Sequence, residues 1–523
     1  MVSMSSPAQS AASVPTAPPR WASGPVIVGC IAIFKFLVHL YAAKNYGYFV
    51  DELYFIACSK HLAWGYVDMP GLLPLVVRIE RVLFGDGLHA IRFLAAVAGA
   101  ANVLLAGWIA RELGGRRFAQ GLTALCVLVA PFYLAFNSYI SMNAFEPLFW
   151  MGCALLLIRI IKTGNEKLWL WFGVLSGVGL NNKYSMAFFG AGIVLGLLLT
   201  RHRRMLLHKW IWLGGVIAVL LIMPNLLWNM QHHFPFRQLM ANVAHSGRNV
   251  SLNPLQFVGQ EIVGLMPLAF PVWLIGVGFL LLDRQGRRFA PLAWTYLFIL
   301  VVMMVAPNGR VYYAAPAYPM LFAAGAVAIE PWLSRPRLAW IKPAYASLLL
   351  VFGALMGPVV VPVLPVDTFI RYSLATHLQQ PRIETHKLGP LPQFYADMFG
   401  WEEMVQVVAK AYDSLPPAER ARTAIVAANY GQAGAVDLFG KKYGLPNAIS
   451  SHQNYYFWAD LTQPADTIID MGESYEHLAQ IFRQVEPAGD VYHPYSMPYE
   501  HFTLYICRGL KYPIQDVWRP NWN

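Results

Sequence analysis

The chain is poor in charged residues and cysteines, and it lacks the common nucleotide-binding and nucleophile motifs. Only 13% of its 523 residues are charged, about half the share of a typical soluble domain. Its five cysteines are scattered, mostly within apolar stretches, so neither a disulfide framework nor a metal-binding spacing is present. The sequence contains no Walker loop, dinucleotide fingerprint or nucleophile elbow. A nucleotide-driven reaction therefore has no support.

The sequence is instead rich in apolar residues. Hydrophobic residues make up 57% of the chain, and the mean hydropathy is +0.44. These values indicate a polytopic α-helical membrane protein. The formal net charge is +11, but the basic residues cluster in short loops between apolar runs. That distribution is typical of membrane topology and argues against nucleic acid as a partner.

Eleven segments are long and apolar enough to be candidate membrane spans, since a spanning helix needs about 20 such residues. They lie near 25–43, 88–110, 118–136, 146–161, 168–181, 184–200, 210–229, 258–282, 289–306, 312–331 and 341–362. The fifth and sixth are separated only by Asn181-Asn182-Lys183, which leaves a single broken or re-entrant helix as an alternative.

Basic residues are concentrated in alternate loops, as in Arg116-Arg117, Arg203-Arg204 and Arg287-Arg288. The positive-inside rule places these loops in the cytoplasm. The prediction is an inner-membrane protein of a bacterium, with a cytoplasmic N-terminus and residues 363–523 in the periplasm. Residues 1–24 are rich in Ser, Ala and Pro and are predicted to be a disordered cytoplasmic tail.

Two further regions lie outside the predicted spans. Apolar residues recur at helical spacing within 53–85, which predicts two helices lying in the membrane interface. From 363 onwards charges and Pro-Pro turns appear, and strand-like runs such as Thr423–Ala427 alternate with helical stretches. The sequence thus predicts a transmembrane domain over 25–362 and a soluble α/β domain over 363–523.

Asp51 and Glu52 are adjacent acids directly after the first predicted span. Desolvation and mutual repulsion make such a pair costly at a membrane surface. The two acids either cap an interfacial helix that begins at Leu53, or supply a base for an acceptor together with a group that holds a cation or donor. Capping and catalysis are compatible, because a cap fixes the orientation of a carboxylate.

Two more acids are placed on the same predicted side. Asp68 precedes Pro70, and Glu146 precedes Pro147 at the start of the fourth predicted span. Both positions suit helix N-termini, so each acid could serve only as a cap. Alternatively, Asp68 and Glu146 join Asp51 around one pocket, where a divalent cation would relieve their repulsion.

Lys183 and Arg310 are basic residues on the predicted outer side. A lysine at the end of a span often extends to the interface, whereas a lysine that faces acids suits a phosphate ligand. Arginine is also well suited to phosphate, and it is followed here by Tyr312 and Tyr313. Acids and bases at one membrane face fit transfer from a lipid phosphate, which requires a base for the acceptor and cations for the departing phosphate.

The sequence resembles the PMT-type (protein O-mannosyltransferase-like, family 39) glycosyltransferases, in the bacterial branch related to the lipid A aminoarabinose transferases. The resemblance covers nearly the whole chain after residue 25 and rests on the order of several motifs. These motifs are Tyr48–Tyr54, Gly65–Gly71, Asn143–Leu148, Asn182-Lys183-Tyr184, Gly309–Pro319 and Asn429–Ala435. Glu146 stands where relatives usually have aspartate, and Met69 where they often have histidine or lysine.

The resemblance implies a GT-C fold and an inverting transfer of a sugar from a polyprenyl-phosphate donor, with Asp51 as the general base. The acceptor would be a glycan, a lipid such as lipopolysaccharide, or a protein. Lys183 and Arg310, with Tyr312 or Tyr313, are the candidate phosphate ligands, and Glu52, Asp68 and Glu146 would tune the base or bind a cation. The alternatives are a transporter or flippase of a lipid-linked sugar and a non-catalytic scaffold. A transporter should show mid-span ionisable groups and repeated halves, and no repeat is visible.

Overall fold

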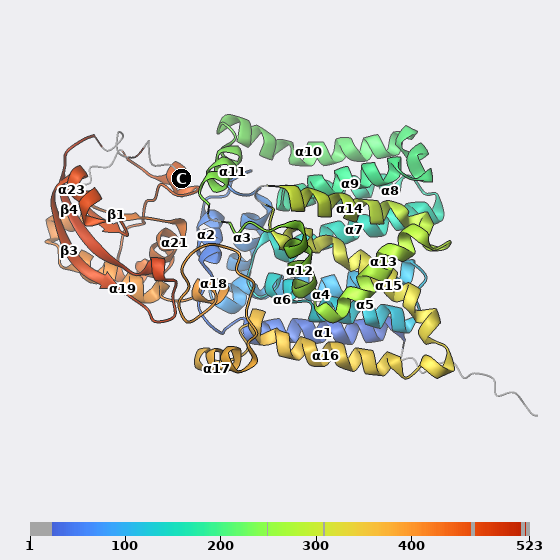
Figure 1. Ribbon diagram of the computed structural model, residues 1–523. Helices are drawn as coiled ribbons and strands as arrows, with labels where there is room; N and C mark the ends of the chain where they lie inside the picture. Colours follow the sequence, from blue (N-terminus) through green and yellow to red (C-terminus); the bar gives the residue numbers. More distant parts are fainter. Residues whose placement is uncertain (1–22, 248, 307–308, 462–465, 514–517, 519–523) are drawn as a thin grey trace, which may run out of the picture.

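The computed structural model describes residues 23–247, 249–306, 309–461, 466–513 and 518. A bundle of membrane-type helices forms one part of the molecule, and a smaller mixed α/β domain covers one end of it (Figure 1). The predicted N-terminal tail, 1–24, lies outside the described residues except for its last two positions. The bundle contains α1 (Gly24–Ala42), α4 (Leu88–Glu112), α5 (Arg117–Val129), α6 (Pro131–Phe136), α7 (Met142–Thr163), α8 (Leu168–Asn182), α9 (Met186–Leu198), α10 (Lys209–Gln231), α12 (Pro254–Gly264), α13 (Phe270–Leu282), α14 (Ala290–Val305), α15 (Tyr318–Leu333) and α16 (Ile341–Val360).

Every predicted span contains a helix, but not every one is a complete crossing. Within the described part of the chain, seven helices are long and apolar enough to cross a membrane. An eighth crossing would require a bent pair of helices. The segments predicted at 118–136, 168–181 and 184–200 hold shorter helices, because Pro131 begins a new helix after α5 and a turn at Lys183–Ser185 separates α8 from α9.

The span predicted at 258–282 is not one continuous helix. The chain bends by 98° between Pro254–Gly264 and Pro267–Leu282. Met266 has a φ of 73°, and the following proline has no backbone N–H to continue the helix. At Gly264 an added Cβ would lie 2.1 Å from the ring of Phe132, so only glycine allows this close approach. The break brings α12 against α6 near the end of the bundle.

The two helices predicted between 53 and 85 are α2 (Val50–Lys60) and α3 (Leu72–Phe84). Helix α3 leaves Ile79, Val82 and Leu83 exposed, which is consistent with an interfacial helix. Helix α2 is not interfacial, because eight of its eleven residues are buried. It lies between the helical bundle and the C-terminal domain (Figure 1), so both sides of this helix are covered by protein.

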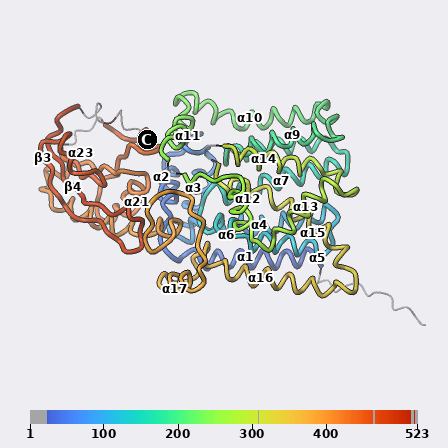
Figure 2. The backbone as a smooth tube through the Cα atoms, in the orientation of Figure 1, coloured from blue at the N-terminus to red at the C-terminus, as the bar shows by residue number. Residues whose placement is uncertain are grey.

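The C-terminal domain contains a four-stranded sheet in the order β1-β2-β4-β3. Strands β1 (Thr423–Ala427) and β2 (Thr467–Met471) are parallel, as a crossover connection requires, and β3 (Phe482–Val491) and β4 (Phe502–Leu510) complete the sheet in antiparallel pairings. The strand predicted at Thr423–Ala427 is thus confirmed. Its main helices are α19 (Trp401–Asp413) and α21 (Tyr430–Phe439), while α11 (Pro235–His245), α17 (Val366–Thr376) and α18 (Gln393–Ala396) lie at the junction with the bundle (Figures 1 and 2).

Helices α2 and α21 are in direct contact and join the two parts of the molecule. An added Cβ at Gly434 would lie 2.8 Å from the backbone of Leu53, and one at Gly431 would lie 2.4 Å from the side chain of Val50. Buried residues of α2 and of the sheet belong to one continuous apolar core. The glycines of α21 therefore allow the C-terminal domain to pack against the first turn of α2, which carries Asp51 and Glu52.

Candidate functional site

A cavity of about 580 Å³ lies where the helical bundle meets the C-terminal domain. One wall is apolar and is formed by α6, α12 and α16, through residues such as Phe132, Phe136, Val263 and Met356. The polar part of the wall comes from loops and helix ends of both domains. Its polar side chains include Asp51, Asp68, Asn143, Asn249, Arg310, Arg382, Glu384, His386, Asp397, Asn429, Tyr430, His452, Tyr499 and Glu500.

Asp51 lies in the first turn of α2 and lines this cavity. Its Oδ1 accepts a hydrogen bond of 2.6 Å from the hydroxyl of Tyr430, the first residue of α21. The ring of Tyr430 lies 5.0 Å from that of Tyr54, which fixes its direction. A residue of the C-terminal domain thus orients the carboxylate that the sequence predicts as the base.

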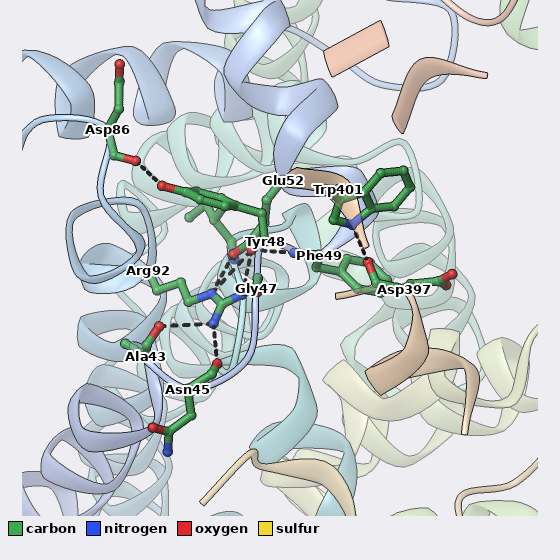
Figure 3. Close-up of polar contacts among 11 residues, drawn as sticks. Ala43, Asn45, Gly47, Tyr48, Phe49, Glu52, Asp86, Arg92, Asp397 and Trp401 are labelled. Atoms are coloured by element: carbon green, nitrogen blue, oxygen red, sulfur yellow. Dashed lines mark hydrogen bonds and ion pairs between the residues drawn. The ribbon is translucent and has the colours of Figure 1, made fainter. Parts of the chain in front are cut away.

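Glu52 has a different environment from its neighbour. It is fully buried, and Arg92 of α4 donates to it from Nε at 2.9 Å and from Nη2 at 2.7 Å (Figure 3). The backbone N–H groups of Phe49 and Ile140 also donate to its carboxylate, at 2.9 and 3.1 Å. Glu52 is not among the described residues that line the cavity. Protein donors occupy both carboxylate oxygens of Glu52, so its contacts favour a positioning role, and its predicted catalytic role stays a prediction.

Arg92 extends the same network to the loop before α2. Its guanidinium donates to the carbonyls of Ala43 at 3.0 Å and Gly47 at 2.8 Å (Figure 3). Together with the capping of the Phe49 N–H, these bonds hold the start of α2 against α4 and the segment after α6. Of the two explanations offered for the acidic pair, helix capping therefore applies to Glu52. Asp51 instead lines the cavity.

Asp68 also lines the cavity, as the sequence predicts for an acid near Asp51. Its Oδ1 accepts a hydrogen bond of 3.1 Å from the hydroxyl of Tyr54. Burial raises the pKa of Asp68 to about 7, and the nearby charge of Asp51 adds to the increase. A carboxyl whose pKa is raised in this way suits a group that donates or accepts a proton.

Lys183 and Glu146 form an ion pair with each other at 2.8 Å. The ammonium also donates to Asn143 at 2.7 Å, and the hydroxyl of Ser185 donates to Glu146. Neither Lys183 nor Glu146 is among the described residues that line the cavity, although Asn143 is. The predicted role of Lys183 as a phosphate ligand stays a prediction, and its hydrogen bond to Asn143 connects the ion pair to a residue of the cavity wall.

The predicted arrangement of Asp51, Asp68 and Glu146 around one cation is not formed. In the described ranges, no group of three or more His, Cys, Asp or Glu side chains is placed to hold a metal ion. The physical reason is the nearby ammonium of Lys183, which neutralises Glu146 more directly than a shared ion would. Of these three acids, Asp51 and Asp68 line the cavity.

Arg310 lines the cavity, as does Tyr312. The guanidinium of Arg310 donates to Glu384 at 2.8 Å and to Asn249 at 3.0 Å. Tyr313 is not among the described lining residues, and its ring lies 4.6 Å from the ammonium of Lys183. Of the four predicted phosphate ligands, Arg310 and Tyr312 therefore have access to the cavity.

Sequence reasoning missed the acids that the C-terminal part of the chain contributes. Glu384 pairs with Arg310, and Glu500 accepts hydrogen bonds from Asn429 at 2.9 Å and from Gln432 at 2.8 Å. Asp397 accepts a hydrogen bond of 2.9 Å from Tyr499. Burial raises the pKa of Asp397 to about 8, against the opposing effect of that hydrogen bond. Asn429 within the motif Asn429–Ala435 was the one available signal.

Comparisons with known proteins agree with this architecture. The family model for dolichyl-phosphate-mannose-protein mannosyltransferases matches residues 68–228. A lipid A galacturonosyltransferase, RgtD, of Rhizobium johnstonii is 25% identical over 333 residues, which cover 62% of this chain and 68% of that protein.

Two solved structures have a similar fold. ArnT from Cupriavidus metallidurans, bound to undecaprenyl phosphate, matches with a TM-score of 0.60 and 14% identity, over 92% of this chain and 97% of that one. The oligosaccharyltransferase AglB from Archaeoglobus fulgidus matches with a TM-score of 0.50 and 10% identity, over 86% of this chain and 70% of that one. These identities show a shared fold and do not by themselves assign a substrate.

Proposed function

We propose that the chain is a PMT-type GT-C glycosyltransferase and that it transfers a sugar from a polyprenyl-phosphate donor to an acceptor hydroxyl with inversion. The transfer takes place at the periplasmic face of a bacterial inner membrane. The observation that carries the proposal is that Asp51 and Arg310 line one cavity that also has an apolar wall. A lipid phosphate, a sugar and an acceptor require these three environments together.

The bond changes follow from this arrangement. Asp51 removes the proton from the acceptor hydroxyl, and the resulting oxygen forms a bond to the anomeric carbon. The bond between that carbon and the phosphate oxygen breaks, and its electron pair leaves with the polyprenyl phosphate. Arg310 stabilises the negative charge that develops on this phosphate, with Tyr312 beside it. The products are the glycosylated acceptor and polyprenyl phosphate.

Donor binding also requires Arg310 to exchange partners. In the structure its guanidinium pairs with Glu384, which belongs to a strap, residues 379–393, that contributes several residues to the cavity wall. Val250 donates a backbone hydrogen bond to Ile383 in the same strap. A phosphate that binds Arg310 competes with Glu384, so we expect donor binding to weaken the ion pair between Arg310 and Glu384 of the strap.

A divalent cation remains part of the proposal. Asp51 and Asp68 line the cavity together, and Mg²⁺ is commonly held by one or two carboxylates plus substrate phosphate. No step above is routed through the ion. Chelation with EDTA followed by addition of Mg²⁺ or Mn²⁺ tests this part: lost and restored transfer supports a cation, and unchanged transfer refutes it.

The decisive assay for the function uses the purified protein in proteoliposomes with a polyprenyl-phosphate sugar labelled in the sugar. The expected result is release of polyprenyl phosphate and appearance of label in a glycan, lipopolysaccharide or protein acceptor from the cell envelope. Membranes that lack the protein are the control. Binding of the donor without release of polyprenyl phosphate would refute the enzyme and favour a transporter of the lipid-linked sugar.

A further inference from the structure

Two short turns carry exposed arginines at the end of the helical bundle that lies farthest from the C-terminal domain (Figure 1). The first is η2 (Arg201–Leu207), between α9 and α10, and the second is η4 (Gly286–Phe289), between α13 and α14. The positive-inside rule assigns this end of the bundle to the cytoplasm. Seven exposed cations on these turns and directly beside them form the basic surface: Arg201, Arg203, Arg204, Lys209, Arg284, Arg287 and Arg288.

A hydrogen bond holds the two turns together. Nε2 of His202 in η2 donates to the carbonyl of Arg288 in η4 at 2.7 Å. The carboxylate of Asp283 accepts from backbone N–H groups at the start of η4, at 2.7 and 3.2 Å. Below the surface, Met205 packs against the core of the bundle, and Phe289 is buried. Both turns are therefore anchored, and they present their arginines as one surface.

The chain supplies little negative charge to neutralise the basic surface. Asp283 serves the backbone of η4, and Glu166 pairs with His208 at 2.6 Å. None of the seven cations forms an ion pair with a residue that the structure describes. Residues 1–22 contain no aspartate or glutamate. The basic surface therefore keeps its positive charge, and it attracts anionic groups from outside the chain.

Exposed apolar side chains lie directly beside these cations. Leu207 is 85% exposed, Leu282 is 79% exposed and Trp212 is 66% exposed. The indole N–H of Trp212 donates to the carbonyl of Leu206 at 2.8 Å, which holds the ring next to η2. Tryptophan is enriched where lipid headgroups meet the hydrocarbon, and long basic side chains extend from that boundary towards the headgroups. The combination fits a phospholipid, whereas a soluble anionic partner would leave Leu207 and Leu282 in water.

We propose that η2 and η4 form a binding site for an anionic phospholipid of the adjoining membrane leaflet. The guanidinium groups of both turns bind the phosphate oxygens of the headgroup, because their planar donors match phosphate and basic pockets beside spanning helices suit anionic headgroups. Leu207 and Trp212 contact the acyl chains. The bound lipid connects the turn between α9 and α10 to the turn between α13 and α14. The site lies at the other end of the bundle from the cavity and does not depend on the proposed transfer reaction.

Native mass spectrometry of the purified full-length protein in detergent tests the proposal. The protein is titrated separately with cardiolipin, phosphatidylglycerol and the zwitterionic phosphatidylethanolamine, and the apparent Kd of each lipid is measured. We expect the two anionic lipids to bind at least about tenfold more tightly than phosphatidylethanolamine. This preference should decrease as the ionic strength rises, because salt screens exposed charges. Equal affinities for the three lipids would overturn the proposal.

A double substitution locates the site. Arg204→Gln with Arg287→Gln removes one charge from each turn, so we expect the apparent Kd for cardiolipin to rise about tenfold. Arg335→Gln with Arg337→Gln is the matched control, because it removes two exposed arginines from the turn between α15 and α16. Both variants should keep the unfolding midpoint of the lipid-free protein, since the substituted side chains are exposed. Unchanged binding in the first variant, or an equal loss in both, would contradict the assignment.

Discussion

Glu52→Gln removes the negative partner from an ion pair that is buried on both sides. The side chain of Glu52 is 0% exposed and that of Arg92 is 1% exposed. The substitution leaves the guanidinium of Arg92 charged, surrounded by protein and without its counter-ion. It also weakens the acceptor for the backbone N–H groups of Phe49 and Ile140.

The expected cost is large for a single atom change. Breaking a buried ion pair by removing one partner typically costs about 3–5 kcal/mol, since the remaining charge is uncompensated. In a cooperative unit of this size, we expect the unfolding midpoint to fall by about 3–10 °C. Arg92→Met should cost a similar amount, but the double variant should cost about 2–4 kcal/mol less than the sum of the two, because neither charge is then left alone.

Thermal unfolding in detergent, followed by tryptophan fluorescence, measures these shifts. Glu112→Gln is the matched control, because Glu112 also pairs with two cations, Arg159 and Lys162, but at a partly exposed site. We expect that substitution to change stability by less than about 1 kcal/mol. If Glu52→Gln unfolded like the unmodified protein and yet abolished transfer, Glu52 would take part in the chemistry and its positioning role would be refuted.

Three further predictions follow from the cavity wall. Tyr430→Phe keeps the ring that packs on Tyr54 but removes the hydrogen bond to Asp51. Because a hydrogen bond to a charged group is worth about 1.5–3 kcal/mol, steady-state kinetics should show kcat lower by about 10–100-fold. Tyr412→Phe is its control, because it removes a hydroxyl that donates to the carbonyl of Arg420 and is not among the described lining residues. Equal losses in both variants would contradict the positioning of Asp51 by Tyr430. Arg310→Lys keeps the positive charge but loses the planar guanidinium group, so the KM for the donor should rise about tenfold while the unfolding midpoint changes little. An unchanged KM would exclude Arg310 as a phosphate ligand. Folding raises the pKa of Asp397 from 3.8 to about 8. Between these two pH values the folded protein keeps a proton that the unfolded chain has released. The stability that Asp397 contributes is therefore lost as pH rises from about 4 to 8. Unfolding midpoints of Asp397→Asn should therefore depend less steeply on pH than those of the exposed control Asp413→Asn, and parallel profiles would refute the raised pKa.

Much of the fold could be predicted from periodicity and composition. The apolar runs give the helices of the bundle, and the short β-branched runs give β1 and β2. The bend between α12 and α13 was hidden, because the apolar run continues through it and only Gly264 and Pro267 signal a break. The burial of α2 was also hidden, since it depends on a domain that begins more than 300 residues later in the sequence.

The site could be predicted only where the residues are close in sequence or share a membrane face. Asp51 and Asp68 do meet at the cavity, as their sidedness indicated. Sidedness alone could not determine which acids pair with which cations, and the structure joins Glu52 to Arg92 and Glu146 to Lys183. Glu384 and Asp397 belong to loops of the C-terminal part, and Glu500 ends the short 3-10 helix Pro498–Glu500. None of them has a periodic sequence pattern, so only the folded arrangement brings them to the cavity.

The central claim is that Asp51 removes the proton from the acceptor, and Asp51→Asn tests it most directly. Transfer from a polyprenyl-phosphate sugar and binding of that donor should be measured on the same purified preparation. Loss of general-base catalysis lowers rates by about 10²–10⁴-fold, so the account predicts a fall of kcat in this range with donor affinity within about threefold of the unmodified protein. Transfer at the full rate in Asp51→Asn would contradict the account.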